Sequence, residues 1–144
     1  MKNIIPALIM ISALFASCKK DDPGTSTSPS ALAVSVSATV AKGTWRVSYF
    51  FDDTDETSKF AGYSFTFGPN GVVTAVRAGS TVTGTWGTGF DDSRAKLLLD
   101  FTSPDDFLEL NEEWHILERT NTKVRLQHIS GGNGGTDMLT FEKN

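Results

Sequence analysis

Two histidines and one cysteine are the main candidates for nucleophilic or acid–base chemistry in this chain of 144 residues. A catalytic triad needs a histidine beside a nucleophile and an acid behind the histidine. His115 follows Trp114 and His128 precedes Ile129, in segments of strand character that favour outward or rim positions. The sequence also lacks a G-x-S-x-G motif. We therefore expect no catalytic residue, and we predict that the protein is not an enzyme.

Four pairs of adjacent acids could supply the two carboxylates that a glycosidase needs. Adjacent residues of a strand point to opposite faces, and acidic pairs in loops usually face water. We therefore expect solvated charges rather than a catalytic pair at all four places: Asp52–Asp53, Asp91–Asp92, Asp105–Asp106 and Glu112–Glu113.

Metal ligands are also scarce. The acidic loop 52–56 offers hard oxygen atoms for Ca²⁺, but it lacks the glycine and the final glutamate of an EF-hand loop. The segment 131–137 is close to a calcium-binding G-G-x-G-x-D unit, but Asp137 falls one position late and the unit does not repeat. Two histidines and one cysteine are too few for a typical zinc site. We expect a flexible hairpin loop at 131–137, and neither a metal nor a cofactor.

Aromatic side chains are the remaining signal, because tyrosine and tryptophan can line an apolar pocket or stack on sugars. All three Trp, both Tyr and every Phe except Phe15 follow residue 42. Alternation assigns most of the large apolar residues to a core: Trp45, Phe65, Phe67, Leu97, Leu99, Phe101 and Phe141. If a cavity opens, we expect residues near strand ends to line it, namely Tyr63, Trp86 and Trp114, with Phe90 on a rim loop.

The elements that must position these side chains are short strands. Apolar and polar residues alternate from Trp45 to Tyr49, as in a half-buried strand. The same reasoning predicts eight strands, at 43–51, 63–67, 72–76, 81–87, 97–101, 112–119, 122–129 and 138–142. A Gly/Asp loop is expected at 87–93, and helical turns are expected only within 52–60 and 103–110.

The spacing of these strands suits an all-β fold with antiparallel neighbours joined by hairpins. No strand–helix alternation is present, which excludes a doubly wound α/β fold. Closing the meander on itself removes exposed edges, so we predict a small eight-stranded antiparallel meander barrel. An open β-sandwich is the alternative.

Residues 1–17 have the pattern of a signal peptide. Lys2 precedes the apolar run from Ile4 to Phe15, and that run of about 12 residues is shorter than the roughly 20 that span a bilayer. The sequence around Leu14–Cys18 resembles the lipobox of bacterial lipoproteins, although Phe15 replaces the usual Leu, Val or Ile. The resemblance implies that Cys18 is lipidated and becomes the first residue of the mature protein. A soluble secreted protein with a free thiol is the alternative.

The segment Lys19–Asp22 is similar to the sorting signal of surface-exposed Gram-negative lipoproteins. That similarity implies anchoring in the outer membrane with the domain on the cell surface, a periplasm-facing domain being the alternative. Residues 18–41 are rich in Ser, Thr, Pro and Ala and hold no aromatic residue. Such a segment buries too little apolar area to offset its ordering entropy, so we predict a lipidated cysteine followed by a flexible tether. The alternation in 32–40 leaves an added strand as the alternative.

The predicted domain, 42–144, carries one family signature. Gly43–Trp45 resembles the G-x-W motif that opens lipocalins, and Gly84–Trp86 repeats it. With the ending Leu139–Lys143, the chain resembles the lipocalin-like domains of Gram-negative outer-membrane lipoproteins. The resemblance implies that Gly43 and Trp45 are structural, with Trp45 across the closed end of the barrel. The domain is shorter than a typical lipocalin, so aromatic residues could fill its interior.

These observations predict a membrane-anchored, lipocalin-like protein that binds a small apolar ligand or lipid without catalysis. One alternative is a filled barrel that contacts an envelope protein or a protease through its surface. Carbohydrate binding at the cell surface is the other. The net charge of −4 and the absence of a basic block argue against nucleic acid as a partner.

Overall fold

A computed structural model of the protein describes residues 28–130 and 134–144. The predictions of a signal peptide, a lipidated Cys18 and a sorting signal concern residues outside this part of the chain. No helix in the described part is long and apolar enough to cross a membrane.

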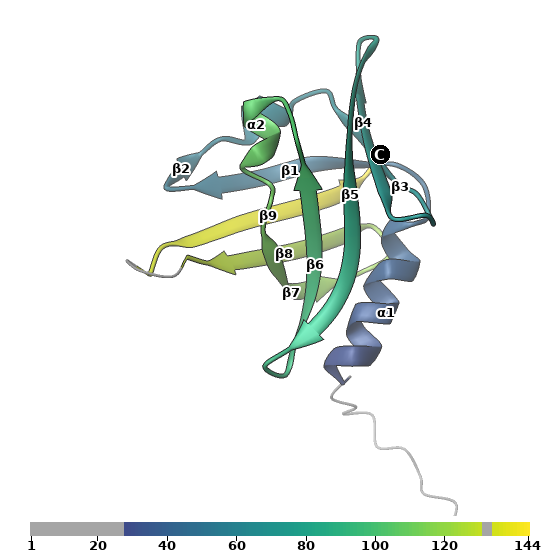
Figure 1. The fold of residues 1–144 in the computed structure, drawn as a ribbon, viewed down its shortest axis with the longest axis vertical. Coiled ribbons are helices and arrows are strands. Elements are labelled where there is room, and N and C mark those ends of the chain that lie inside the picture. Colours follow the sequence, from purple (N-terminus) through teal and green to yellow (C-terminus); the bar gives the residue numbers. More distant parts are fainter. Residues whose placement is uncertain (1–27, 131–133) are drawn as a thin grey trace, which may run out of the picture.

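Nine antiparallel strands form one closed sheet, which confirms the predicted all-β meander barrel (Figure 1). Each main strand pairs with its neighbour in the chain, and the last strand pairs with the first, so the alternative of an open sandwich is wrong. The eight main strands match the eight predicted, and the two-residue β2 is an addition. The strands are β1 (Trp45–Asp52), β2 (Thr54–Asp55), β3 (Ser64–Phe67), β4 (Val72–Arg77), β5 (Ser80–Asp91), β6 (Arg94–Phe101), β7 (Glu113–Arg119), β8 (Lys123–Ile129) and β9 (Thr136–Lys143).

Two short helical turns lie where the sequence predicts them. The 3-10 turn η1 (Thr57–Phe60) follows β2, and α2 (Asp105–Leu108) connects β6 to β7. Each brings one fully buried phenylalanine to the core, Phe60 from η1 and Phe107 from α2.

The predicted loop at 87–93 is wrong. Strand β5 continues to Asp91, and the turn is only Asp92–Ser93, whose φ angles are 41° and 64°. Gly87 and Gly89 are extended and pair with Leu98 and Lys96 of β6. The backbone ladder to β6 therefore overrides the weak strand preference of these glycines.

The predicted tether is wrong for residues 29–40, which form the helix α1 (Pro29–Val40), and the alternative of an added strand is wrong as well. Ser28 caps the helix by accepting a hydrogen bond from the Ala31 N–H at 3.3 Å, and Pro29 occupies the first turn. Ala33, Val36 and Val40 lie on one face of the helix and are buried, and α1 packs against β5 and β6. Burial of this face, rather than helix propensity, stabilises α1.

Candidate functional site

The interior of the barrel is filled by large side chains. Residues that alternation assigns to the core are buried, and several rings contact one another across the interior: Phe141, for example, lies 5.3 Å from Phe65 and 5.5 Å from Phe67 between ring centroids. Such packing leaves the described surface grooves as the places where a ligand can be held.

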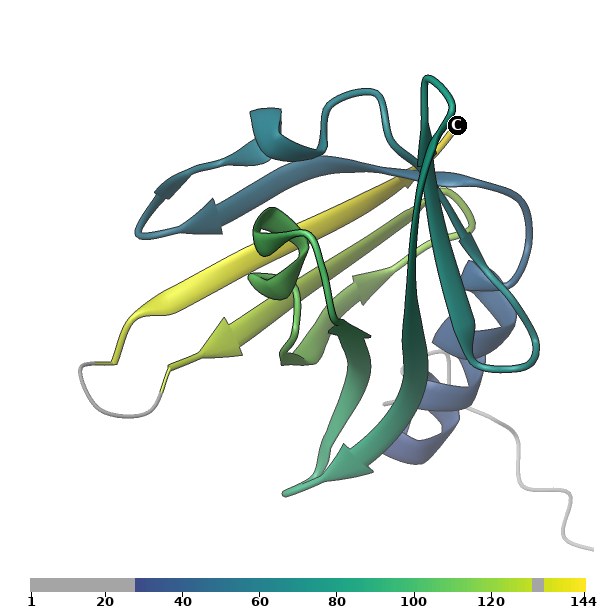
Figure 2. The same ribbon diagram turned by 45° about the horizontal axis from the view of Figure 1, so that its top comes forward.

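A plug of aromatic rings covers one end of the barrel. The ring of Phe107 lies 5.0 Å from both Phe101 and Tyr63, 5.4 Å from Phe60 and 5.9 Å from Phe65, between centroids. Figure 2 shows that α2, which carries Phe107, lies between η1 and β6. We call Phe107 and these four neighbours the aromatic plug.

An ion-pair bridge holds the plug in place. Lys59 of η1 donates to Glu56 at 2.6 Å and to Glu109 at 2.8 Å, and Glu109 directly follows α2. Hydrogen bonds to Glu109 and Glu56 raise the pKa of Lys59 well above its usual range. The bridge therefore joins η1 to the segment that positions Phe107.

The helix α1 covers the opposite end of the barrel (Figure 1). Trp45 is fully buried beside the end of α1, and its indole N–H donates to the Val40 carbonyl at 2.9 Å. Gly43 has a φ of 82°, and a Cβ there would lie 2.8 Å from Cε of Lys143. Trp45 is therefore placed to join β1 to α1 and offers no surface to a ligand.

The four residues expected to line a cavity are not gathered around one space. Tyr63 and Trp114 are buried in the core instead, Tyr63 within the aromatic plug and Trp114 with its indole N–H donating to the Leu110 carbonyl at 3.0 Å. Phe90 lies in β5 and not on a loop, and it is 61% exposed. Trp86 is partly exposed and lines two grooves.

Trp86 is held in one orientation. Its indole N–H donates to the Gly68 carbonyl at 2.9 Å, and its ring meets Phe67 edge-on with 5.4 Å between centroids. Its backbone N–H donates to the Gly71 carbonyl at 2.9 Å. The turn between β3 and β4 therefore fixes the ring, which presents a rigid apolar wall without further ordering cost.

The first of these grooves lies between α1 and β5 and has a volume of about 520 Å³. This value is within the range of small-molecule sites. The side of α1 that flanks its buried face forms one wall, and β5 with the β3–β4 turn forms the other. We call it the α1–β5 groove; its residues are Val34, Ser37, Ala38, Ala41, Pro69, Gly71, Trp86, Gly87 and Thr88. Its lining is mostly apolar, with hydroxyl groups only from Ser37 and Thr88.

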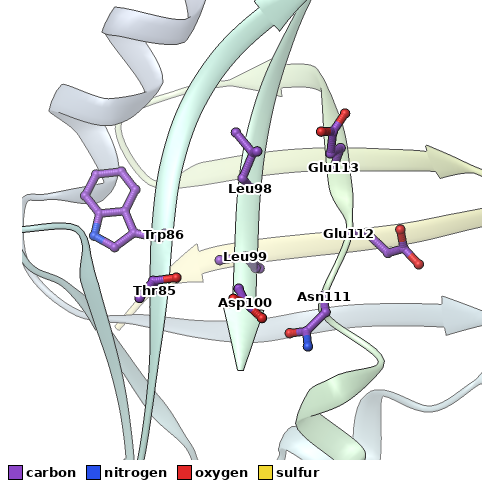
Figure 3. Close-up of a pocket in the computed structure, with 8 residues that line it drawn as sticks. All are labelled: Thr85, Trp86, Leu98, Leu99, Asp100, Asn111, Glu112 and Glu113. Carbon is purple, nitrogen blue, oxygen red and sulfur yellow. The ribbon is translucent and has the colours of Figure 1, made fainter. Parts of the chain in front are cut away.

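The second groove, of about 400 Å³, lies over β5, β6 and the start of β7. Figure 3 shows Trp86 on one side of it and Glu112 and Glu113 on the other. Two of its polar side chains already have partners: Asn111 bonds the backbone of Phe101 at 2.6 and 2.7 Å, and Glu113 pairs with Lys96 at 2.7 Å. These groups stabilise the join between β6 and β7, so this groove is less suited to a ligand.

The two histidines also have structural partners. Nδ1 of His128 lies 3.4 Å from a carboxylate oxygen of Glu112, and the His128 ring meets Trp114 edge-on. Nδ1 of His115 lies 3.4 Å from the guanidinium of Arg94. Among the residues that the structure describes, no group of three His, Cys, Asp or Glu is arranged to hold a metal ion.

The acidic residues at the end of β1 and in β2 interact with neighbouring groups of the fold. The Asp55 carboxylate accepts the Thr57 N–H at 3.0 Å, and hydrogen bonding to Thr57 lowers the pKa of Asp55. Burial, and after it the charges of Asp137, Asp53 and Glu56, raise the pKa of Asp52 above its ordinary 3.8. Folding therefore favours the protonated form of Asp52 relative to the unfolded chain.

This shift predicts a pH dependence for Asp52→Asn. Stability from protonated Asp52 is fully present below the ordinary pKa of 3.8 and is lost as the pH rises through the raised pKa. The variant cannot ionise at this position, so we expect it to be more stable than the parent at neutral pH and equally stable in acid. Urea unfolding across this pH range measures the difference, and a difference that does not change with pH would contradict the expectation.

Comparisons with known proteins support the architecture. No family profile matches the chain, and no curated protein matches it. The fold is similar to the crystal structure of a DUF4847 family protein from Bacteroides vulgatus ATCC 8482, with a TM-score of 0.52 and 19% sequence identity. The match covers 76% of this chain and 97% of that protein. At this identity the similarity shows a shared barrel fold.

Proposed function

We propose that this chain is a membrane-anchored, non-catalytic binding protein that holds a small apolar ligand in the α1–β5 groove. The observation that carries the proposal is Trp86, whose ring is fixed by Gly68 and forms a wall of an apolar groove of about 520 Å³. A preformed apolar groove with a few polar groups is the usual form of a small-molecule site. The hydroxyl groups of Ser37 and Thr88 are placed to orient a polar end of the ligand.

The proposal differs from a typical lipocalin in where the ligand lies. Gly43–Trp45 opens β1 of an eight-stranded meander, which supports a lipocalin-like domain. The aromatic plug and the buried rings fill the interior that a lipocalin ligand would enter. The ligand is therefore placed outside the barrel wall, between α1 and β5.

The membrane anchor and the location are part of the same proposal. The lipobox-like residues ending at Cys18 support lipidation of that cysteine, and Lys19–Asp22 supports the outer membrane and the cell surface. Because α1 starts at Pro29, only ten residues lead from Cys18 to its cap, Ser28. Ten residues reach at most about 35 Å even when fully extended, so a lipid on Cys18 would keep the groove near the bilayer, where apolar ligands concentrate.

Val34→Asp tests the groove. Val34 is 68% exposed, so the fold should tolerate the change, but the carboxylate would lose water when an apolar ligand covers it. We expect affinity for the uncharged fluorescent probe 1-aminoanthracene to fall at least tenfold, about 1.4 kcal/mol. The measurement is a fluorescence titration of residues 19–144, which carry the barrel and α1 without the lipid.

Val76→Asp is the matched control, because Val76 is a 43% exposed valine of β4 that does not line the groove. Its affinity for the probe should equal that of the parent. Equal affinities for all three proteins would contradict the proposal.

A filled barrel that binds an envelope protein is the second candidate. The tightly packed interior supports it, because a barrel without a roomy cavity must use its surface. Failure of the chain to bind 1-aminoanthracene and a series of fatty acids would favour this candidate.

A further inference from the structure

Exposed apolar side chains gather where α1 begins. Phe90 is 61% exposed, Leu117 48% and Ile129 46%. Leu117 and Ile129 line a groove of about 810 Å³ together with Pro29, the first residue of α1, and with Ala95. Phe90 lies directly across the strand pair from Ala95. We call Phe90, Leu117, Ile129 and Pro29 the helix-start patch.

The patch lies at one end of the molecule. Strand β5 runs between two hairpins, the first at Ala78–Gly79 and the second at Asp92–Ser93 (Figures 1 and 2). The start of α1 and the second hairpin lie at the same end, and the first hairpin lies at the other. A strand of this length, 12 residues, spans roughly 35–40 Å, so the two hairpins are well separated.

The length of chain before α1 indicates what covers the patch. Ser28 follows Cys18 by ten residues, a segment that spans about 15–20 Å when flexible and about 35 Å when fully extended. A lipid on Cys18 would therefore keep the start of α1 close to the headgroups. The other end of β5 would then point away from the bilayer.

We propose that the helix-start patch is a membrane-facing surface that lies against the headgroups and the upper acyl chains of the bilayer. The proposal rests on the lipid anchor of the proposed function but not on the ligand groove. Apolar side chains at such an interface insert by about 5–10 Å. Arg94, which lines the groove beside the patch, would face the lipid phosphates.

A pair of serine-to-cysteine variants at the two ends of β5 tests this orientation. Ser93→Cys is beside the patch and Ser80→Cys is at the far end, and both serines are exposed. Each full-length protein is purified from bacterial membranes, labelled with a thiol-reactive NBD dye, and placed in vesicles of phosphatidylethanolamine and phosphatidylglycerol containing a brominated phosphatidylcholine. At the insertion depth above, we expect the label at 93 to lose about half of its fluorescence and the label at 80 to lose almost none.

The outcomes separate the two proposals. The intact mass, together with the absence of labelling of the parent protein, reports whether Cys18 is lipidated. A lipidated protein with equal quenching at both positions, or with stronger quenching at 80, would overturn the orientation and leave the anchor in place. An unlipidated Cys18 would overturn the anchor and the orientation together.

Substitutions within the patch give an independent check. Phe90→Glu combined with Leu117→Glu should reduce the quenching at 93 to the level seen at 80, since charged side chains disfavour insertion. Val76→Glu, outside the patch, should leave the quenching unchanged. Equal quenching in the double variant and the parent would show that the patch does not contact lipid.

Discussion

Phe107→Ala is expected to lower the free energy of unfolding by about 3–5 kcal/mol, the usual cost of removing a fully buried ring. Phe107 has almost no exposed surface and contacts the rings of Phe60, Tyr63, Phe65 and Phe101. Rings from η1, β3 and β6 would lose their common neighbour, and the cavity could close only by moving these elements. Urea unfolding followed by tryptophan fluorescence measures the change.

Leu108→Ala is the control, since Leu108 is the next residue of α2 and is exposed. Substitutions at such surface positions usually change stability by no more than about 0.5 kcal/mol. If Phe107→Ala and Leu108→Ala had the same unfolding midpoint, the aromatic plug would not stabilise the barrel. In that case the claim that the interior is packed at this end would be wrong.

Val36→Asp is expected to have an effect of similar size at the other end of the barrel. Val36 is fully buried in the face of α1 that packs on β5 and β6. The carboxyl group there would have to stay protonated, be reached by water, or leave the core together with the helix. Each of these costs several kcal/mol. We expect a loss of more than about 3 kcal/mol in the free energy of unfolding, and loss of probe binding because α1 forms one wall of the groove.

Val34→Asp is the matched control for this experiment, with the same substitution two residues away on the exposed side of the same helix. It should weaken probe binding while the free energy of unfolding changes little. Chemical denaturation of both variants, with circular dichroism as the signal, compares them directly. Equal stability of the two variants would mean that α1 is not docked, which would remove the groove as well.

The strands could be predicted from the sequence because their inward residues alternate with polar ones, as in Trp45–Tyr49 and Tyr63–Phe67. The segment 29–40 could not, because serine, threonine and valine favour extended chain over helix. The spacing of Leu32, Val34 and Val36 fits a strand, whereas that of Ala33, Val36 and Val40 fits a helix. Only contact with β5 and β6 decides between the two.

The α1–β5 groove could not be predicted from the sequence either, because one of its walls is the helix α1. Trp86 was expected to line a cavity because it lies near a predicted strand end, and in the structure it lines two surface grooves. Trp114 and Tyr63 were misassigned because a position near a strand end does not show whether another element covers that end. The covering residue at Tyr63 is Phe107, which belongs to a four-residue helix.

The three tryptophans allow the most direct test of whether a ligand binds outside the barrel. Trp45 and Trp114 are buried in the interior, and Trp86 lines the α1–β5 groove, so their three indole N–H signals report on different places. The measurement is a two-dimensional NMR titration of ¹⁵N-labelled residues 19–144 with 1-aminoanthracene. We predict that the Trp86 indole signal shifts while those of Trp45 and Trp114 stay in place. Shifts of Trp45 and Trp114 without Trp86 would place the ligand in the barrel interior and contradict this account.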